Sequence, residues 1–266
     1  MSEDRVRIAV DAHVATVSLV RGDKHNALDR AMFDALDAAT DELRDRGDVR
    51  AVVLHGEGPS FCSGLDFPSF MASGADIGGS LLDRRDGDTA NLAQRVSVDW
   101  LELPMPVIAA LHGNVLGGGF QIALGADVRI AAPDVRMSVM EIKYGLVPDM
   151  GITRALPDLV PLDVAKELTW TGRIVEAEEA LRLGLVTRLA EDPFAEARAL
   201  AAEIASKSPH AIRSGKRLLA EAYGHTPGDI LALETSLQRE LLGSPNQIAA
   251  VQAAMTKQPA DFSDPE

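Results

Sequence analysis

The chain is poor in cysteine and in basic residues, and it lacks long apolar runs. Cys62 is its only cysteine in 266 residues, so no disulfide can form within the chain. Lys and Arg total 26 against 40 Asp and Glu, a formal net charge of −14. This balance argues against nucleic-acid binding, which depends on neutralising phosphates, and against anionic membrane surfaces.

Two further absences concern targeting. No apolar run approaches the roughly 18 residues that a transmembrane helix needs. The N-terminal residues MSEDRVRIAV lack the basic start and apolar core of a secretory signal, so a cytoplasmic protein is the default expectation.

Enough apolar residues, 46% of the chain, are present to build one substantial core. Strand patterns alternate with helical ones up to about residue 160, and helices dominate afterwards, which predicts an α/β fold with a helical C-terminal region. Asp29 is the predicted N-cap of a helix over residues 30–46. Residues 72–91 are rich in Gly and Asp and are predicted to form an irregular loop.

The most informative stretch is VIAALHGNVLGGGFQIALGADVRIA, at residues 107–131. An apolar strand leads through a turn into three glycines, Gly117 to Gly119, and then into a helix-like segment. Glycines at such a turn leave backbone N–H groups open to the close approach of a ligand. Tight packing alone also explains a lone GGG, and a phosphate loop is disfavoured because no GK[ST] follows.

A second strand, at residues 51–55, leads into FCSGLD, another small-residue loop. Two such loops can direct two N–H donors at one oxygen that becomes negative during a reaction. A third segment, RGDKHNALD at residues 21–29, is compact, polar and basic.

These segments, with MEIKYGLVPDMG and SPHAIRSGKRLL, resemble the enoyl-CoA hydratase/isomerase (crotonase) family in their order and spacing over residues 5–257. The resemblance implies a spiral of β-β-α turns that binds an acyl-CoA thioester. It implies an acyl-CoA-binding core at residues 1–190 and a helical oligomerisation region at residues 191–266. A homotrimer or a dimer of trimers is expected.

By motif position, the resemblance assigns the two oxyanion-hole N–H groups to Ser63 and Gly118. Coenzyme A enters as part of the substrate, and no tightly bound cofactor or metal is expected, because no zinc-type or calcium-type ligand spacing occurs. Arg21, with Lys24 and His25, is a candidate to face the coenzyme A phosphates, and Lys216 and Lys257 are weaker candidates. The residues implied to bind coenzyme A or substrate are Lys24, His25, Ala27, Gly64, Leu65, Asp66 and Gly117.

Three positions are candidates for acid/base chemistry. The family carries a glutamate just after the glycines, but this chain has Gln121, whose amide cannot take a proton at neutral pH. Glu141 stands at the second glutamate position, and an apolar cleft would raise the pKa of its carboxyl group. Asp149 matches an aspartate of the dienoyl-CoA isomerase branch, although it could equally be the N-cap of a helix starting near Met150.

The sequence therefore favours an isomerase that moves a double bond of an acyl-CoA in fatty-acid metabolism, with Glu141 carrying the proton. An enoyl-CoA hydratase, a lyase in which Glu141 acts with Asp149 or with water held by Gln121, is the alternative within the family. A CoA-ester-binding protein with little catalysis is the alternative of another class. Residues 67–100 are expected to contribute to the acyl pocket.

Overall fold

The computed structural model describes residues 4–265 except 74–79, 86 and 223–224. Its larger sheet has six strands in the order β1-β2-β3-β4-β6-β9, and only the β1–β2 hairpin is antiparallel. The strands are β1 (Val6–Asp11), β2 (Val14–Leu19), β3 (Ala51–Gly56), β4 (Val107–Leu111), β6 (Val128–Ala131) and β9 (Arg188–Leu189). Strand β3 is buried except for His55, and β4 is buried throughout, so both read as apolar runs rather than as alternating patterns.

A smaller sheet lies beside the glycine block. It has the order β5-β7-β8, with β5 (Asn114–Leu116), β7 (Arg136–Ser138) and β8 (Val175–Glu176). Strands β5, β8 and β9 are two or three residues long, and the sequence pattern did not predict them. The two sheets and their connecting helices confirm the predicted α/β architecture.

The helix predicted over residues 30–46 ends two residues early, at Arg44, and the predicted predominance of helices after about residue 160 is confirmed. Three short 3-10 helices accompany the α-helices: η1 (Gly22–Lys24), η2 (Glu141–Tyr144) and η3 (Ile152–Arg154). The α-helices are α1 (Arg30–Arg44), α2 (Phe67–Ser73), α4 (Leu92–Glu102), α5 (Gly118–Leu124), α6 (Leu156–Leu159), α7 (Leu162–Thr171), α8 (Ala177–Leu183), α9 (Pro193–Ala205), α10 (Pro209–Glu221), α11 (Pro227–Leu241) and α12 (Pro245–Thr256).

Helix α1 shows how local chemistry sets an element. Asp29 accepts a hydrogen bond from the Met32 N–H at 2.9 Å, which confirms it as the N-cap. The apolar stripe of α1, including Phe33 and Leu36, is buried against the core. Helix α1 also packs on α4, where the buried Arg95 guanidinium bonds both oxygens of Asp37.

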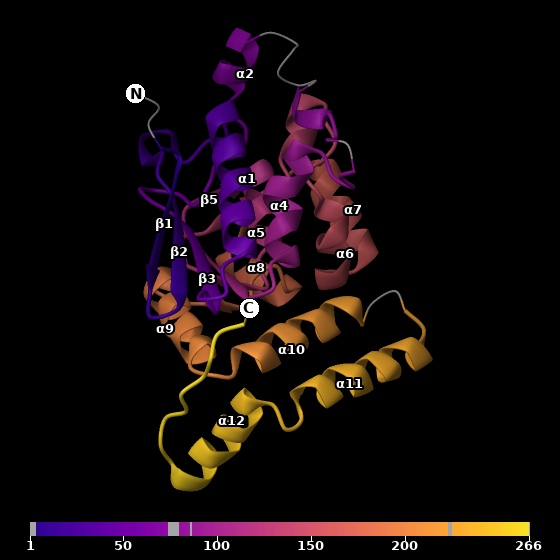
Figure 1. Cartoon of the computed structure of the whole chain (residues 1–266). Helices are drawn as coiled ribbons and strands as arrows, with labels where there is room; N and C mark the ends of the chain where they lie inside the picture. The colour runs from indigo at the N-terminus through magenta and orange to yellow at the C-terminus, as the bar shows by residue number, and fades with distance from the viewer. Residues whose placement is uncertain (1–3, 74–79, 86, 223–224, 266) are drawn as a thin grey trace.

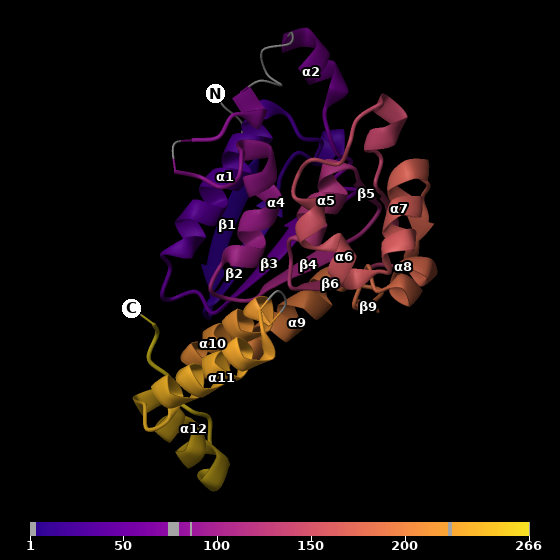
Figure 2. The ribbon, with the colours of Figure 1, turned by 90° about the vertical axis from the view of Figure 1, so that its right-hand side faces the viewer.

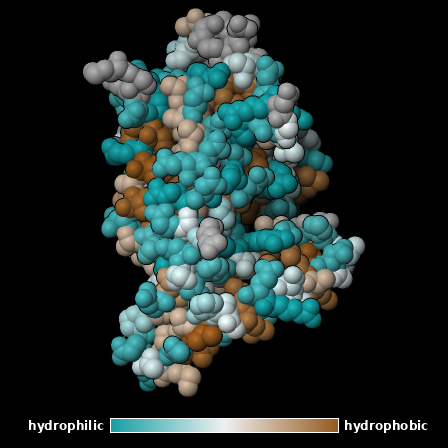
Figure 3. All heavy atoms as spheres, in the orientation of Figure 1, coloured by the Kyte–Doolittle hydropathy of each residue, from teal (hydrophilic) through white to brown (hydrophobic). Residues whose placement is uncertain are grey.

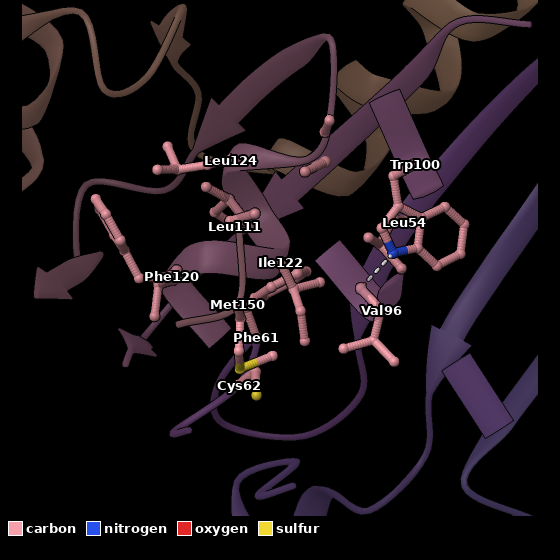
Figure 4. Packing of buried hydrophobic residues seen from close by; sticks show 14 of the residues in the cluster. Leu54, Phe61, Cys62, Val96, Trp100, Leu111, Phe120, Ile122, Leu124 and Met150 are labelled. Carbon is pink, nitrogen blue, oxygen red and sulfur yellow. Dashed lines mark hydrogen bonds between the residues drawn. The ribbon is translucent and has the colours of Figure 1, made fainter. Parts of the chain in front are cut away.

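The main core lies between the large sheet and helices α1, α4 and α5. Figure 4 shows side chains of β3, α4 and α5 meeting there, with Trp100 donating its indole N–H to the Val96 carbonyl oxygen. Cys62 and Met150 lie at one side of this cluster, directly beside α5. The core therefore reaches up to the glycine block that the sequence singled out.

Helix α9 begins just after the predicted boundary between residues 190 and 191, a boundary that stays a prediction. This helix packs across β3, β4 and β6, and its alanines Ala197, Ala201 and Ala205 belong to a buried cluster with the sheet. Their small side chains let the helix approach the strands closely. Helices α10 to α12 project away at the end of the molecule opposite α2 (Figures 1 and 2).

The predicted loop at residues 72–91 is partly helical: α2 extends to Ser73, and residues 80–82 form a helical turn. Residues 74–79 and 86 of that stretch lie outside the described residues. Within the described part of the chain, no helix is both long enough and apolar enough to cross a membrane.

Candidate functional site

The two small-residue loops lie side by side. The Cys62 N–H donates to the Asn114 carbonyl at 3.1 Å, and the Leu116 N–H donates to the Cys62 carbonyl at 3.0 Å. A Cβ added at Gly119 would lie 2.4 Å from the Cys62 carbonyl oxygen, so only glycine permits this approach. The expectation that both loops serve one site is thus supported by direct backbone contact.

Backbone hydrogen bonds decide which N–H groups of these loops are available. The Ser63 N–H, predicted as an oxyanion donor, donates to the His25 carbonyl oxygen at 2.9 Å and is therefore occupied. Leu65 forms a parallel bridge with Leu28, whose N–H and carbonyl bond the flanking Gly64 and Asp66. In that pattern the Leu65 N–H points away from Leu28, and it has no partner among the described residues.

Gly118 offers the matching donor. Gly117 donates its own N–H to the Ser138 carbonyl at 2.9 Å and has φ +53°, which turns the chain into α5. The Gly118 N–H starts that helix and has no acceptor in the described parts of the chain. A Cβ on Gly64 would lie 3.6 Å from the Gly118 nitrogen. The loop that carries Leu65 and the start of α5 therefore form one continuous wall, and the N–H groups of Leu65 and Gly118 both belong to it.

A pocket of about 430 Å³ opens at this wall. It is predominantly apolar, and Glu141 and Asp149 are its carboxylates. Phe67, Leu81, Leu82 and Ala93 line it, as expected for an acyl pocket within residues 67–100. The remaining lining residues are Leu28, Phe33, Ser63, Gly64, Leu65, Gly117, Gly118, Met140, Tyr144, Leu146, Val147 and Met150.

Gln121 and Glu141 are joined by a hydrogen bond. Gln121 is only 1% exposed, and its Nε2 donates to Glu141 Oε1 at 2.6 Å. Its Oε1 accepts from the Met150 N–H at 2.9 Å. The other carboxylate oxygen of Glu141, Oε2, is buried and has no hydrogen-bond partner among the described residues.

Burial raises the pKa of the Glu141 carboxyl group, because the apolar surroundings disfavour its charged form. The negative charge of Asp149 raises it further, while the hydrogen bond from Gln121 acts in the opposite direction. Partial burial also raises the pKa of Asp149. Both shifts bring the carboxyl groups closer to the range in which they exchange protons near neutral pH.

The interpretation of Asp149 as a helix N-cap is wrong. No helix starts at Met150; the next one, η3, begins at Ile152 after Gly151, which adopts φ +84° and makes no side-chain cap. Asp149 instead lines the pocket with Glu141. Its capping alternative is thereby removed, whereas its role in chemistry stays a prediction.

The basic residues proposed to bind coenzyme A differ in whether they already bond other groups of the protein. Lys24 is exposed and has no ion pair within the described residues. Arg21 bonds Asp66 at 2.7 Å and also the Ala27 carbonyl, so these three predicted binding residues hold one another. Lys216 bonds Asp127 and two core carbonyls, which ties α10 to the core.

The other reactive side chains are buried or engaged in internal contacts. Cys62 is buried, and desolvation raises the pKa of its thiol to about 12, so it is not a nucleophile at neutral pH. His25 contacts the Ser60 hydroxyl at 2.9 Å, and His112 contacts the Gly58 carbonyl at 2.9 Å. Across the described ranges no group of three or more His, Cys, Asp or Glu side chains could hold a metal ion.

Two contacts at the site escaped sequence reasoning. Met150 supplies the N–H that holds Gln121, and its side chain lies beside Gly118. Phe67 stacks on Tyr144 with ring centroids 3.8 Å apart, joining α2 to η2 at the pocket. Neither contact is local in sequence, and the only available signal was aromatic side chains within segments expected near the substrate.

A strand-flanked pair of glycine-containing loops, a buried glutamate and an apolar pocket define a crotonase-type site. The sequence matches the Enoyl-CoA hydratase/isomerase family over residues 9–265, and the chain belongs to that family. It is therefore a family enzyme whose class of substrate is an acyl-CoA.

The similar proteins include both a protein named as a hydratase and one named as an isomerase. A Bacillus subtilis protein named "probable enoyl-CoA hydratase" is 32% identical, with coverage of 97% of this chain and 98% of its own. The mouse mitochondrial Delta(3,5)-Delta(2,4)-dienoyl-CoA isomerase is 33% identical over 92% of this chain and 77% of its own. The crystal structure of an enoyl-CoA hydratase from Bacillus anthracis superposes with a TM-score of 0.89 at 27% identity, covering 97% and 98%.

Proposed function

We propose that the enzyme moves a double bond along the acyl chain of an enoyl-CoA or dienoyl-CoA, as an isomerase of fatty-acid metabolism. Coenzyme A is then part of the substrate, and no separate cofactor is needed. The observation that carries the proposal is the hydrogen bond that pairs Glu141 with an amide, Gln121, at a position where a glutamate would place a second carboxylate directly against it.

The thioester oxygen is bound by the N–H groups of Leu65 and Gly118 in this proposal. Both groups lack an internal acceptor in the described structure, and both residues line the pocket. A pair of fixed backbone donors stabilises an oxyanion most when it bears the full negative charge, as in an enolate. Leu65 thus replaces Ser63, whose N–H is bonded to His25.

Glu141 removes a proton from C2 of a 3-enoyl- or 3,5-dienoyl-CoA. The C2–H bonding electrons move into the acyl system, and the thioester oxygen takes up the negative charge. Return of the proton at C4, or at C6 of the dienoyl chain, forms the 2-enoyl or 2,4-dienoyl product without any net oxidation. Glu141 can itself return the proton to C4, and Asp149, the second carboxylate of the pocket, is suited to protonate C6 of the longer dienoyl chain.

Hydration makes a different demand, since water must be activated while C2 is protonated. Two carboxylates near one another meet it better than one carboxylate and a fixed amide. Gln121 cannot exchange a proton at neutral pH and is engaged on both sides by Glu141 and Met150. The Gln121 amide therefore favours isomerisation.

The test is an assay of 3-enoyl-, 3,5-dienoyl- and 2-enoyl-CoA with product analysis. We expect isomerised products from at least one of the first two substrates and slow hydration of the third. Rapid hydration of 2-enoyl-CoA without isomerisation would establish the hydratase instead. The variant Gln121→Glu sharpens the choice, because strong gain of hydration means that the natural enzyme is not built as a hydratase.

A CoA-ester-binding protein with little catalysis is the remaining alternative, and calorimetry can detect it. Tight acyl-CoA binding without turnover of any thioester would favour it. Turnover that disappears in Glu141→Ala would exclude it.

We also propose assembly into a homotrimer or a dimer of trimers through α10 to α12. These helices expose apolar side chains. Figure 3 shows several apolar patches in the lower part of the molecule, where the helices lie. The exposed residues are Leu219, Leu231, Leu242, Ile248, Val251 and Met255. Light scattering of the full chain would test this, with a trimer or hexamer expected and a monomer contradicting it.

A further inference from the structure

Gln121 occupies a place where its side-chain orientation is determined by its neighbours. The Met150 backbone N–H can only donate, so the oxygen of the Gln121 amide must face it. The Gln121 NH₂ group is then left to face Glu141, where it donates at 2.6 Å. This bond is formed most strongly when Glu141 is ionised.

The two oxygens of Glu141 consequently have different surroundings. Oε1 is held by Gln121 and lies 3.6 Å from the position of a Cβ on Gly117, whereas Oε2 has no partner in the described chain. A buried carboxylate oxygen without a hydrogen bond is costly to maintain and calls for a functional reason. Accepting a proton from a substrate supplies that reason.

We propose that Gln121 is a positioning residue that holds Oε1 of Glu141 and leaves Oε2 as its proton-carrying atom, an inference that rests on the proposed isomerase function. The amide links the base to Met150, whose side chain packs beside Gly118, so the base and one oxyanion donor share a support. Gln121 does not line the pocket and acts only through Glu141.

A glutamate at position 121 would disrupt this arrangement. One of its oxygens would still accept from Met150, but the other would face Glu141 Oε1 at a distance where two carboxylates must share a proton. Asp149 is the charged group that acts on Glu141 from the neighbouring loop. Gln121→Glu would therefore add a third negative group beside a pair that already disfavours ionisation.

The experiment compares Gln121→Met, which keeps side-chain volume but removes both the donor to Glu141 and the acceptor of the Met150 N–H, with Gln121→Glu and a matched control. The control is Ser97→Ala, which removes the 2.5 Å bond from Ser97 to the Gln121 carbonyl and perturbs α5 without touching Glu141. Each variant is measured for kcat and KM across pH. The titration of Glu141 is followed separately by NMR of Glu labelled at Cδ, with Glu141→Gln identifying the signal.

For Gln121→Met we expect the Glu141 titration and the acid limb of kcat to move together to higher pH. On the alkaline plateau, where Glu141 is ionised in every variant, kcat should still fall roughly tenfold to a hundredfold, the effect expected for losing a hydrogen bond to a charged group. KM should stay within about twofold. Gln121→Glu should move the acid limb of kcat to still higher pH. Ser97→Ala should leave both the Glu141 titration and the acid limb of kcat unchanged.

An unchanged Glu141 titration in Gln121→Met would overturn the proposal, as would a plateau kcat equal to that of the natural enzyme. An equal loss in Ser97→Ala would reduce Gln121 to a packing role and overturn it too. If the natural enzyme turned over no thioester, the proposed function and the positioning role would both fail. The NMR titration would even then report whether the bond to Glu141 exists.

Discussion

The inner wall and the rim of the pocket are built in opposite ways. On the wall, Gly117 to Gln121 are buried in α5 and its turn, and their polar atoms are accounted for by named partners or left free toward the substrate. On the rim, residues 142–147 are exposed, with Tyr144 at 53% and Val147 at 74%. A rigid wall can hold reacting groups in fixed geometry, whereas an exposed apolar rim can adapt to the acyl chain.

Among the variants that separate the inner wall from the rim, a change of the base, Glu141, is expected to have the largest effect. Glu141→Gln keeps the shape of the side chain but removes proton transfer, so kcat should fall about 10²- to 10⁴-fold. Acyl-CoA binding should change little, because the oxyanion donors remain. Steady-state kinetics with calorimetry of a substrate analogue would check this, and near-normal turnover would remove Glu141 from the mechanism.

Gly118→Val changes the proposed oxyanion donor, which lies on the same wall as the base. A Cβ there would lie 2.7 Å from Leu28 Cδ1 and 2.8 Å from the Met150 sulfur, so the surroundings must shift, and the branched side chain also crowds the approach of a ligand to the Gly118 N–H. Loss of one oxyanion donor is expected to cost about 2.7–4 kcal/mol in the transition state, or roughly 100- to 1,000-fold in rate.

Ala38→Val is the matched control, since Ala38 is exposed on α1 and does not line the pocket. Thermal melts and light scattering should show both variants folded and assembled. If Gly118→Val were folded and as active as the control, the oxyanion assignment would be wrong.

The rim should respond more weakly and in a different parameter. Phe67→Ala removes the stack on Tyr144, and aromatic pairs of this kind contribute about 0.5–1.5 kcal/mol. KM for longer acyl chains should rise roughly two- to tenfold while kcat is retained. A series of acyl-CoA lengths would measure it; a loss confined to kcat would mean that the rim takes part in positioning the reacting carbons.

The smallest effect concerns stability. Burial raises the pKa of Glu141 in the folded chain above its unfolded value, so the folded state holds the proton more tightly. That contribution is complete below the unfolded-state pKa and is lost as pH rises through the folded-state pKa. Glu141→Gln should thus be stabilising at neutral pH by about 0.5–2 kcal/mol and much less so in acid.

Chemical unfolding at two pH values would check the sign. A Glu141→Gln chain that is less stable than the natural one at neutral pH would mean that the carboxylate is better solvated than its burial suggests.

The sequence predicted what local chemistry determines. Asp29 caps α1, and the glycine block and FCSGLD loop meet as expected. It missed the hydrogen bonds that depend on residues distant in the sequence. The Ser63 N–H donates to the His25 carbonyl, and the bridge between Leu28 and Leu65 leaves the Leu65 N–H without a partner among the described residues. The alanines of α9, spaced by four residues, are a sequence signal for a helix that packs closely on the sheet.

The most direct test of the account follows one hydrogen atom. A 3-enoyl-CoA carrying deuterium at C2 is converted by the natural enzyme, and the label at C4 of the product is measured by mass spectrometry and NMR. Because Oε2 of Glu141 is buried, we expect a measurable fraction of the deuterium to be delivered to C4 by the natural enzyme and no product from Glu141→Gln. Rapid product formation with the Glu141→Gln variant, or complete loss of the label to solvent with the natural enzyme, would contradict a single shielded carboxylate as the proton carrier.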